Sequence, residues 1–436
     1  MKKFFNYING ENSVKTFGLN SANVGLKILS GIIISKFIAI YIGPYGMALI
    51  GNLKNFLSAI QSIAISGLYK GVVKFISQVK SDALELSKTL STVFYFGFFS
   101  SFFLALLCYY NAEFISDVLF SEDYKYTNII ETMAIVLPFY ALNMFAFSIM
   151  NGFSKQKYLL VINMLCQVLG LAVTLLLIFR ENINGALLAI VITPALNLLI
   201  TIVGIAFRKS LITTIKIKHI SLSVINRLSP YMIMALVSAI AIPIVMVIIR
   251  NYIITALGIE SAGYWTAMTR VSDYYLMFIN SLMVLYILPR FSAINSKSKF
   301  KKEVFSFYKI VMPVFLILLF VIYLGRSILV PLFFSEEFEP VVDLFGFQIL
   351  GDIMRVLAMV IVYKFLAKKM FGHYIILEIF LFLIMYASSV FLIDEFGLKG
   401  AVMGHFFSYS MYFALILLIF NSSLFGILPS DNLEEN

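Results

Sequence analysis

The chain has 436 residues and a formal net charge of +10, with 61% hydrophobic and 13% charged residues. The charged share is about half the ~25% of soluble domains, and a soluble domain of this length could not bury so much apolar surface. The composition therefore indicates a multi-pass membrane protein. Apolar runs of about 20 residues exclude a β-barrel, whose strands need only about ten alternating residues.

Twelve hydrophobic segments follow one another along the chain, each long enough to cross a bilayer as a helix. They lie at about 20–42, 47–68, 89–110, 127–151, 157–179, 184–207, 228–250, 262–289, 305–325, 341–366, 371–393 and 400–421. The basic stretch before the first segment lacks a compact apolar core with a cleavage site, so we expect no signal peptide. The predicted fold is an all-α, polytopic membrane protein.

Basic residues gather in alternate connections. One side of the membrane receives those near 2–15, 70–88, 155–157, 208–227, 290–309 and 364–369. The opposite side receives only Lys125, Arg180, Arg250, Arg326 and Lys399. The positive-inside rule then places both termini in the cytoplasm. The positive charge is explained by membrane topology, so we expect no nucleic-acid partner.

The basic loop 208–227 divides the twelve helices into two sets of six. Three short motifs of the first half recur in the second at a common offset of about 215 residues. The matched pairs are 119–124 with 333–338, Lys155–Tyr158 with Lys368–Tyr374, and Gly43–Lys54 with Gly258–Arg270. Six spans per half give both halves the same orientation. We therefore expect two lobes, 1–207 and 228–436, related by a parallel repeat, with a site between them.

The segment from Gly258 to Pro289 carries two charges, Arg270 and Asp273, inside a hydrophobic helix. An uncompensated Arg or Asp at the centre of a membrane helix costs roughly 2.5–3.5 kcal/mol. Such residues usually face a bundle interior or an aqueous path, which favours a functional role. The alternative is an i,i+3 ion pair that only helps the helices to pack.

Lys54 occupies the place in the second helix that Arg270 occupies in the eighth. Both cations lie about 12 Å inside the outer surface, at 1.5 Å per residue. Lys54 also begins a polar stripe, with Ser58, Gln61 and Ser62 at i+4, i+7 and i+8. A lone Lys near a helix end usually extends to the membrane surface. The depth of Lys54 and the length of its stripe favour a cavity lining instead.

The first helix offers two further cations, Lys27 and Lys36. Lys27 lies on a stripe with Asn20, Asn23 and Ser30. Lys36 has the depth better suited to a cavity shared with the second helix. The two lysines are nine residues apart, about 180° around an ideal helix. They cannot both face one cavity unless the helix bends, so both stay candidates.

The tenth segment carries Gln348, Asp352 and Arg355 at i, i+4 and i+7, with Asp352 near the middle of the span. Asp352 beside Arg355 could be a protonation switch that couples transport to an ion, or a plain ion pair. Asp273 beside Arg270 poses the same choice.

Two titratable residues remain in the last two segments. Glu378, in the eleventh, is a weaker candidate for ion coupling. His405, in the twelfth, shares a helix face with Ser408, Tyr409 and Tyr412, and we interpret it as a hydrogen-bonded packing residue.

The candidate cations would make a shared cavity strongly positive. They are Lys27 or Lys36, Lys54, Arg270 and Arg355. Four uncompensated cations in lipid would cost on the order of 10 kcal/mol, so they must face water, counter-ions or an anionic ligand. Arg binds phosphate as a bidentate fork and Lys as a point charge. This pattern predicts an anionic substrate, a phosphate or pyrophosphate.

The sequence carries no recognisable enzyme signature. It lacks a P-loop, a nucleophile elbow and a zinc-protease motif, so we expect a non-enzyme without catalytic residues, cofactor or metal. The outward connections near 111–126 and 326–340 are short. A polysaccharide polymerase or ligase would be expected to have a larger outer domain, which argues against this alternative.

Short motifs across nearly the whole chain carry a family resemblance. They are Ser35–Phe37 with Ile42–Gly46, Asn52–Lys54, Gly71–Lys74, Gly263–Trp265 with Val271–Asp273, Leu350–Asp352, and Ala367–Lys368 with Tyr374–Glu378. On these motifs the chain resembles the Wzx-type flippases of the polysaccharide-transport branch of the MOP exporter superfamily, particularly the enterobacterial O-antigen and common-antigen translocases.

The resemblance implies a bacterial inner-membrane protein that moves an undecaprenyl-pyrophosphate-linked oligosaccharide from the cytoplasmic to the periplasmic leaflet by alternating access. It also implies that Lys27 or Lys36, Lys54 and Arg270 engage the pyrophosphate, that H+ or Na+ drives transport, and that polysaccharide polymerase machinery is a partner. A drug or organic-cation antiporter on the same fold is the rival, but it predicts an acidic or aromatic cavity. The cationic excess counts against it.

Overall fold

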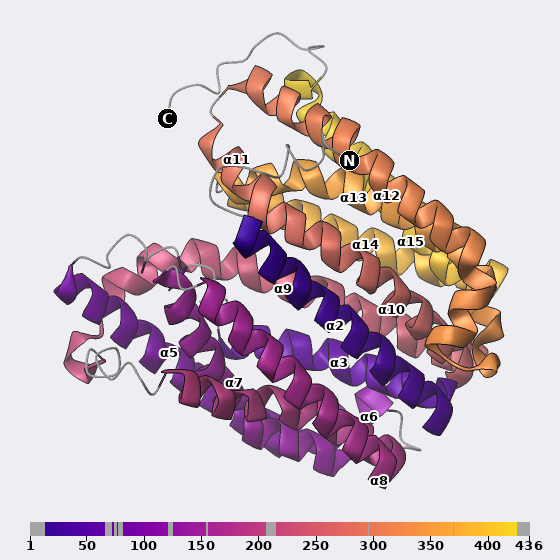
Figure 1. Ribbon diagram of the computed structural model, residues 1–436, viewed down its shortest axis with the longest axis horizontal. Coiled ribbons are helices and arrows are strands. Elements are labelled where there is room, and N and C mark those ends of the chain that lie inside the picture. Colours follow the sequence, from indigo (N-terminus) through magenta and orange to yellow (C-terminus); the bar gives the residue numbers. More distant parts are fainter. Residues whose placement is uncertain are drawn as a thin grey trace. The chain divides into compact units, whose positions relative to one another are not determined.

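The structure, a computed structural model, describes residues 14–65, 72–73, 76, 82–120, 125–153, 156–205, 215–294, 296–368 and 370–424. All regular elements in these ranges are helical, which confirms the all-α prediction. The main helices are α2 (Val14–Tyr41), α3 (Pro44–Ala64), α5 (Ala83–Tyr110), α6 (Ala112–Phe120), α7 (Thr127–Gly152), α8 (Gln156–Ile205), α9 (Leu222–Leu257), α10 (Ile259–Leu282), α11 (Leu288–Ala293), α12 (Lys297–Phe333), α13 (Phe345–Lys368), α14 (Phe371–Phe396) and α15 (Leu398–Leu424) (Figure 1).

Ten helices in the described ranges are long and apolar enough to cross a membrane. This confirms a multi-pass membrane protein, whereas the predicted number of twelve spans is not confirmed. One of the ten, Tyr158–Gly204, has non-helical dihedrals at Asn182 and consists of two helices joined by a kink. The 21-residue helix α3 is not among the ten, because its polar stripe lowers its mean hydropathy.

The helices form two compact units. The N-terminal unit consists of Lys15–Thr266 together with Phe333–Glu337, and the C-terminal unit consists mainly of Ala267–Leu332 and the residues from Phe338 onward. The boundary falls inside α10, because α9 and the start of α10 pack against the helices before them. The lobes 1–207 and 228–436, joined by the linker 208–227, stay a prediction.

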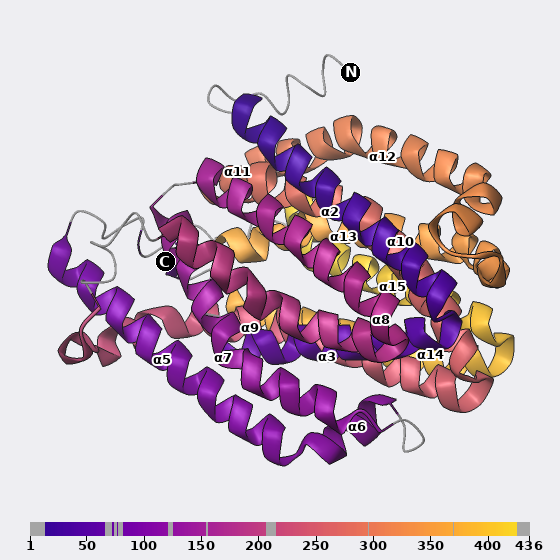
Figure 2. The same cartoon turned by 60° about the horizontal axis from the view of Figure 1, so that its bottom comes forward.

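Within the N-terminal unit, α3 packs against α9, while α5, α7 and α8 run side by side (Figures 1 and 2). The start of α10 comes very close to the start of α3. A Cβ added to Gly263 would lie 2.9 Å from Pro44 Cα and closer still to the Pro44 carbonyl. Glycine is required at this crossing, because any side chain would push the two helices apart.

A side-chain cap and two glycine residues determine where several helices begin or end. The carboxylate of Asp82 caps α5 by accepting hydrogen bonds from the backbone N–H groups of Leu84 (3.0 Å) and Glu85 (3.1 Å). Gly258 separates α9 from α10 with φ at +89°, and Gly397 separates α14 from α15 with φ at +59°. Glycine adopts this left-handed region without the steric strain that a Cβ causes. Each glycine therefore allows a sharp turn between two long helices.

In the C-terminal unit, α15 packs against both α13 and α14. Gly404 on α15 allows the approach to α14, since a Cβ there would lie 2.7 Å from Ser389 Cα. Ser388 Oγ on α14 also donates to the Gly404 carbonyl at 3.2 Å. This close packing positions the polar centre described next.

Candidate substrate and coupling site

A buried carboxylate, Asp352, lies at the centre of the C-terminal unit. Its side chain is 0% exposed. Ser272 Oγ and Tyr275 OH, both on α10, donate to Asp352 Oδ2 at 2.5 Å each, and Gln348 Nε2 donates to the same oxygen at 3.3 Å. On the other side, His405 Nε2 on α15 lies 3.1 Å from Asp352 Oδ1. Four polar groups from three helices thus converge on one carboxylate.

Helical spacing explains part of this arrangement. Ser272 and Tyr275 are three residues apart on α10, and Gln348 and Asp352 are four apart on α13, so each pair shares a helix face. His405 reaches the carboxylate because Gly351 has no side chain. A Cβ at Gly351 would lie 3.0 Å from His405 Nε2 and closer still to the ring carbon Cδ2. The centre therefore depends on a small residue next to the aspartate as well as on the polar groups.

Of the other predicted residues of this unit, Arg355 is connected to this centre by ring contacts. The Arg355 guanidinium lies over the Tyr409 ring, 5.6 Å from its centroid, and Tyr409 in turn packs edge-on against His405 at 4.8 Å. The four hydrogen-bond partners of Asp352 do not include Arg355. Glu378 is buried in α14. Arg270 is half-buried on α10 and Asp273 is exposed.

A second polar centre, not recognised from the sequence, lies in the N-terminal unit around Arg250. We expected Arg250 in a connection on the outer side, but α9 continues to Leu257, and the Arg250 side chain is only 2% exposed. Arg250 Nε donates to Thr266 Oγ1 at 2.8 Å, and Nη1 donates to Asn52 Oδ1 at 2.9 Å. The guanidinium also lies 5.2 Å from the centroid of the Trp265 ring. Thr266, Asn52 and Trp265 are neutral side chains.

Asn52 extends this centre toward α6. Its Nδ2 donates to the Leu119 carbonyl at 2.8 Å and to Asn251 Oδ1 at 2.7 Å. Asn251 Nδ2 donates in turn to the Val118 carbonyl at 2.8 Å. Helices α3, α6 and α9 are thereby joined by side-chain hydrogen bonds. The seven helical residues between Arg250 and the terminating Gly258 were the sequence signal that Arg250 lies inside a helix.

The structure gives different surroundings to the predicted lysines, all of which lie in the N-terminal unit. Lys27 is exposed on α2. Lys36 is half-buried, and its Nζ donates to the Phe334 carbonyl at 2.6 Å. Lys54 and Ser58 are exposed on α3, whereas the preceding turn, Met47–Ile50, is 0% exposed. The polar stripe of α3 is therefore the open side of an otherwise enclosed helix.

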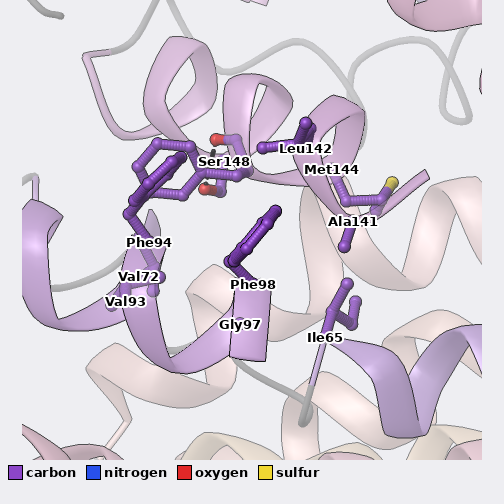
Figure 3. Close-up of a pocket in the computed structure, with 11 residues that line it drawn as sticks. Ile65, Val72, Val93, Phe94, Gly97, Phe98, Ala141, Leu142, Met144 and Ser148 are labelled. Carbon is purple, nitrogen blue, oxygen red and sulfur yellow. Dashed lines mark hydrogen bonds between the residues drawn. The ribbon is translucent and has the colours of Figure 1, made fainter. Parts of the chain in front are cut away.

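A separate pocket in the N-terminal unit is apolar (Figure 3). Helices α5 and α7 provide most of its lining, including Phe94, Phe98 and Phe145. Ser148 contributes a hydroxyl group, which donates to the Phe145 carbonyl at 2.7 Å. None of the predicted cations lines this pocket, so it is distinct from the predicted anion site. Across the described ranges, no group of three His, Cys, Asp or Glu residues could hold a metal ion.

Comparison with solved structures defines the class of fold. An inward-facing multidrug resistance MATE family transporter of the MOP superfamily matches with a TM-score of 0.71, covering 92% of this chain and 95% of that one at 17% identity. At this identity the likeness shows the fold alone. The protein therefore has the fold of MOP superfamily transporters.

Sequence comparison then gives the family. The pattern of the family described as "Polysaccharide biosynthesis protein" matches residues 49–343, more than half of the chain. The chain belongs to this family. It is also 26% identical over 405 residues to the Lipid III flippases of Escherichia coli (strain K12) and Shigella flexneri, covering 92% of this chain and 96% of each relative. The resemblance to Wzx-type MOP flippases is thus confirmed, and the relatives are transporters rather than enzymes.

Proposed function

We propose that this protein flips a lipid-linked oligosaccharide used in polysaccharide biosynthesis from one leaflet of the membrane to the other. The finer form of the proposal is an undecaprenyl-pyrophosphate-linked O-antigen or related surface polysaccharide unit, moved from the cytoplasmic to the periplasmic leaflet of the bacterial inner membrane. Similarity to Lipid III flippases over nearly the full length of both chains supports this substrate class. The positive-inside pattern supports cytoplasmic termini.

The observation that carries the proposal is the open polar stripe of α3. Lys54 and Ser58 are exposed on a helix whose preceding turn is completely enclosed. The pyrophosphate of a lipid-linked glycan supplies oxygens that accept charge-assisted hydrogen bonds from an exposed lysine on this stripe. We assign the same role to Arg270, to Arg355, and to Lys27 or Lys36.

Ion coupling belongs to the same proposal. Asp352 is its main candidate, because it is fully buried and contacts side chains on both α10 and α15. A change in its protonation would alter hydrogen bonds to α10 and α15 together. Asp273 and Glu378 are secondary candidates, and H+ and Na+ both remain suitable ions. We also expect contacts with the polysaccharide polymerase machinery, because it would use the flipped glycan.

Deleting the gene tests the proposed function in cells. Without the flippase, single-unit lipid-linked glycan is expected to accumulate facing the cytoplasm, because it is made there and can no longer cross. Its orientation is measured by labelling intact and opened spheroplasts with a membrane-impermeant reagent. Accumulation of unpolymerised units facing the periplasm would identify a polymerase and overturn the proposal.

A further inference from the structure

Gln348 has one unused hydrogen-bond acceptor beside Asp352. The Gln348 side chain is 2% exposed, and its Nε2 donates to Asp352 Oδ2 at 3.3 Å. Its Oε1 is enclosed and accepts no hydrogen bond from the part of the chain that the structure describes. A buried acceptor without a donor costs free energy, so it needs a physical reason. The neighbouring carboxyl group provides one.

A proton on Asp352 would supply the missing donor. The charged carboxylate only accepts hydrogen bonds, and Ser272, Tyr275 and Gln348 donate to its Oδ2. A protonated carboxyl group has an O–H that donates. The oxygen and the nitrogen of an amide have nearly the same shape, so a half-turn of the Gln348 amide would place Oε1 where Nε2 stands. The amide can therefore donate to the charged form of Asp352 and accept from the protonated form.

Other titratable groups surround this carboxyl group. Arg355 interacts electrostatically with Asp352 and offsets its charge when the carboxyl group is ionised. His405 Nε2 lies 3.1 Å from Oδ1. Histidine ordinarily changes its charge between about pH 5 and 8, so His405 can compete with Asp352 for a proton. The remaining groups are Tyr275 and Asp273 on α10, Tyr409 and Tyr412 on α15, and Glu378 on α14.

We propose that Gln348 is a positioning residue that makes Asp352 a proton site rather than a sodium site, its amide donating to the charged carboxylate and accepting the O–H of the protonated one. The inference rests on the proposed function and names its coupling ion. A hard cation such as Na+ binds oxygen lone pairs. It would require the hydroxyl groups of Ser272 and Tyr275 to turn their hydrogens away from Oδ2, whereas a proton requires only the amide to turn.

Infrared difference spectroscopy on the purified full-length protein measures this protonation directly. A protonated carboxyl group has a C=O stretching band that a carboxylate lacks. When the pH falls from about 8 to about 5, we expect such a band to appear in the unaltered protein and to be missing in Asp352→Asn. Protonation of His405 alone gives no such band, so the band shows where the proton resides. Replacing K+ with Na+ in the buffer should leave it unchanged.

The replacement Gln348→Met separates the positioning role from a structural one. Methionine is similar in length but offers only a weakly accepting sulfur, so the protonated Asp352 loses its partner. The band should move to higher wavenumber, and proton binding should weaken about fivefold. The donation lost with the amide is long, at 3.3 Å, and is the third on one oxygen, so its loss offsets little of this effect. The control Gln167→Met makes the same change at a half-buried position of α8 and should leave the band unchanged.

The outcomes distinguish this inference from the function on which it rests. A band that depends on Asp352, moves in Gln348→Met and is insensitive to Na+ supports the inference. A band unchanged in Gln348→Met would leave Gln348 with a structural role, and loss of the band in Na+ would assign the site to sodium. Either result overturns the inference, as does the absence of an Asp352-dependent band at about pH 5. The proposed function fails separately, if the protein moves no lipid-linked glycan in vesicles.

Discussion

Replacing Lys54 or Arg270 with glutamate is expected to reduce surface glycan export by about 100-fold or more, to the level of a deletion. Under the proposed function, each change removes a charge-assisted hydrogen bond to the diphosphate, worth roughly 1.5–3 kcal/mol, and adds a repulsive charge. A loss of 2.8 kcal/mol corresponds to about 100-fold in binding. Export is measured as surface glycan per cell, normalised to the amount of the protein in the membrane.

Charge reversal at exposed cations provides the control. Arg180→Glu changes an exposed residue of the N-terminal unit. Lys399→Glu breaks an exposed pair with Asp343 in the C-terminal unit, where the Nζ to Oδ2 distance is 3.0 Å, and such exposed pairs contribute little stability. Both controls should export normally. Normal export from both Lys54→Glu and Arg270→Glu would refute the role of these cations in pyrophosphate binding.

Asp352→Asn is expected to impair transport at every pH and to remove its dependence on pH. The asparagine has one acceptor oxygen in place of two and adds an amide donor. The new amide donor takes the place of one carboxylate oxygen, so the hydrogen bonds around this position must rearrange, at a cost of about 1–3 kcal/mol. The variant should therefore also melt at a lower temperature. Transport rates across a pH series and thermal melting in detergent measure the two effects.

The matched control is Asp343→Asn, the same substitution at an exposed carboxylate of the same unit. It should change neither transport nor melting. Wild-type turnover of Asp352→Asn across the whole pH series would leave Asp352 with a structural role only, and the coupling residue would have to be sought elsewhere.

The sequence predicted positions along helices better than contacts between them. The depth of Asp352 and the polar stripe of Lys54 follow from helical spacing, and the structure retains both. The partners of Asp352 on α10 and α15 could not be predicted, because they depend on the register of three packed helices. The approach of His405 in particular depends on the missing side chain of Gly351, and spacing within one helix carries no information about it.

Arg250 shows a second limit of prediction from the sequence. A hydropathy boundary at a charged residue places it at a helix end, yet the helix continues until Gly258 interrupts it. The charge is tolerated inside because the polar groups of Thr266 and Asn52 approach it from α10 and α3. Contacts that come from other helices leave no periodic pattern in the local sequence, so Arg250 was assigned to the outer surface.

Reconstitution into liposomes tests lipid flipping most directly. The purified full-length protein is placed in vesicles that contain a fluorescent lipid-linked pyrophosphate oligosaccharide, and a membrane-impermeant quencher is added outside. The proposed function predicts that the fluorescence falls well below the half that remains in protein-free vesicles, and that Lys54→Glu restores that half. Fluorescence that stays at half with the unaltered protein, under imposed H+ and Na+ gradients alike, would contradict a flippase.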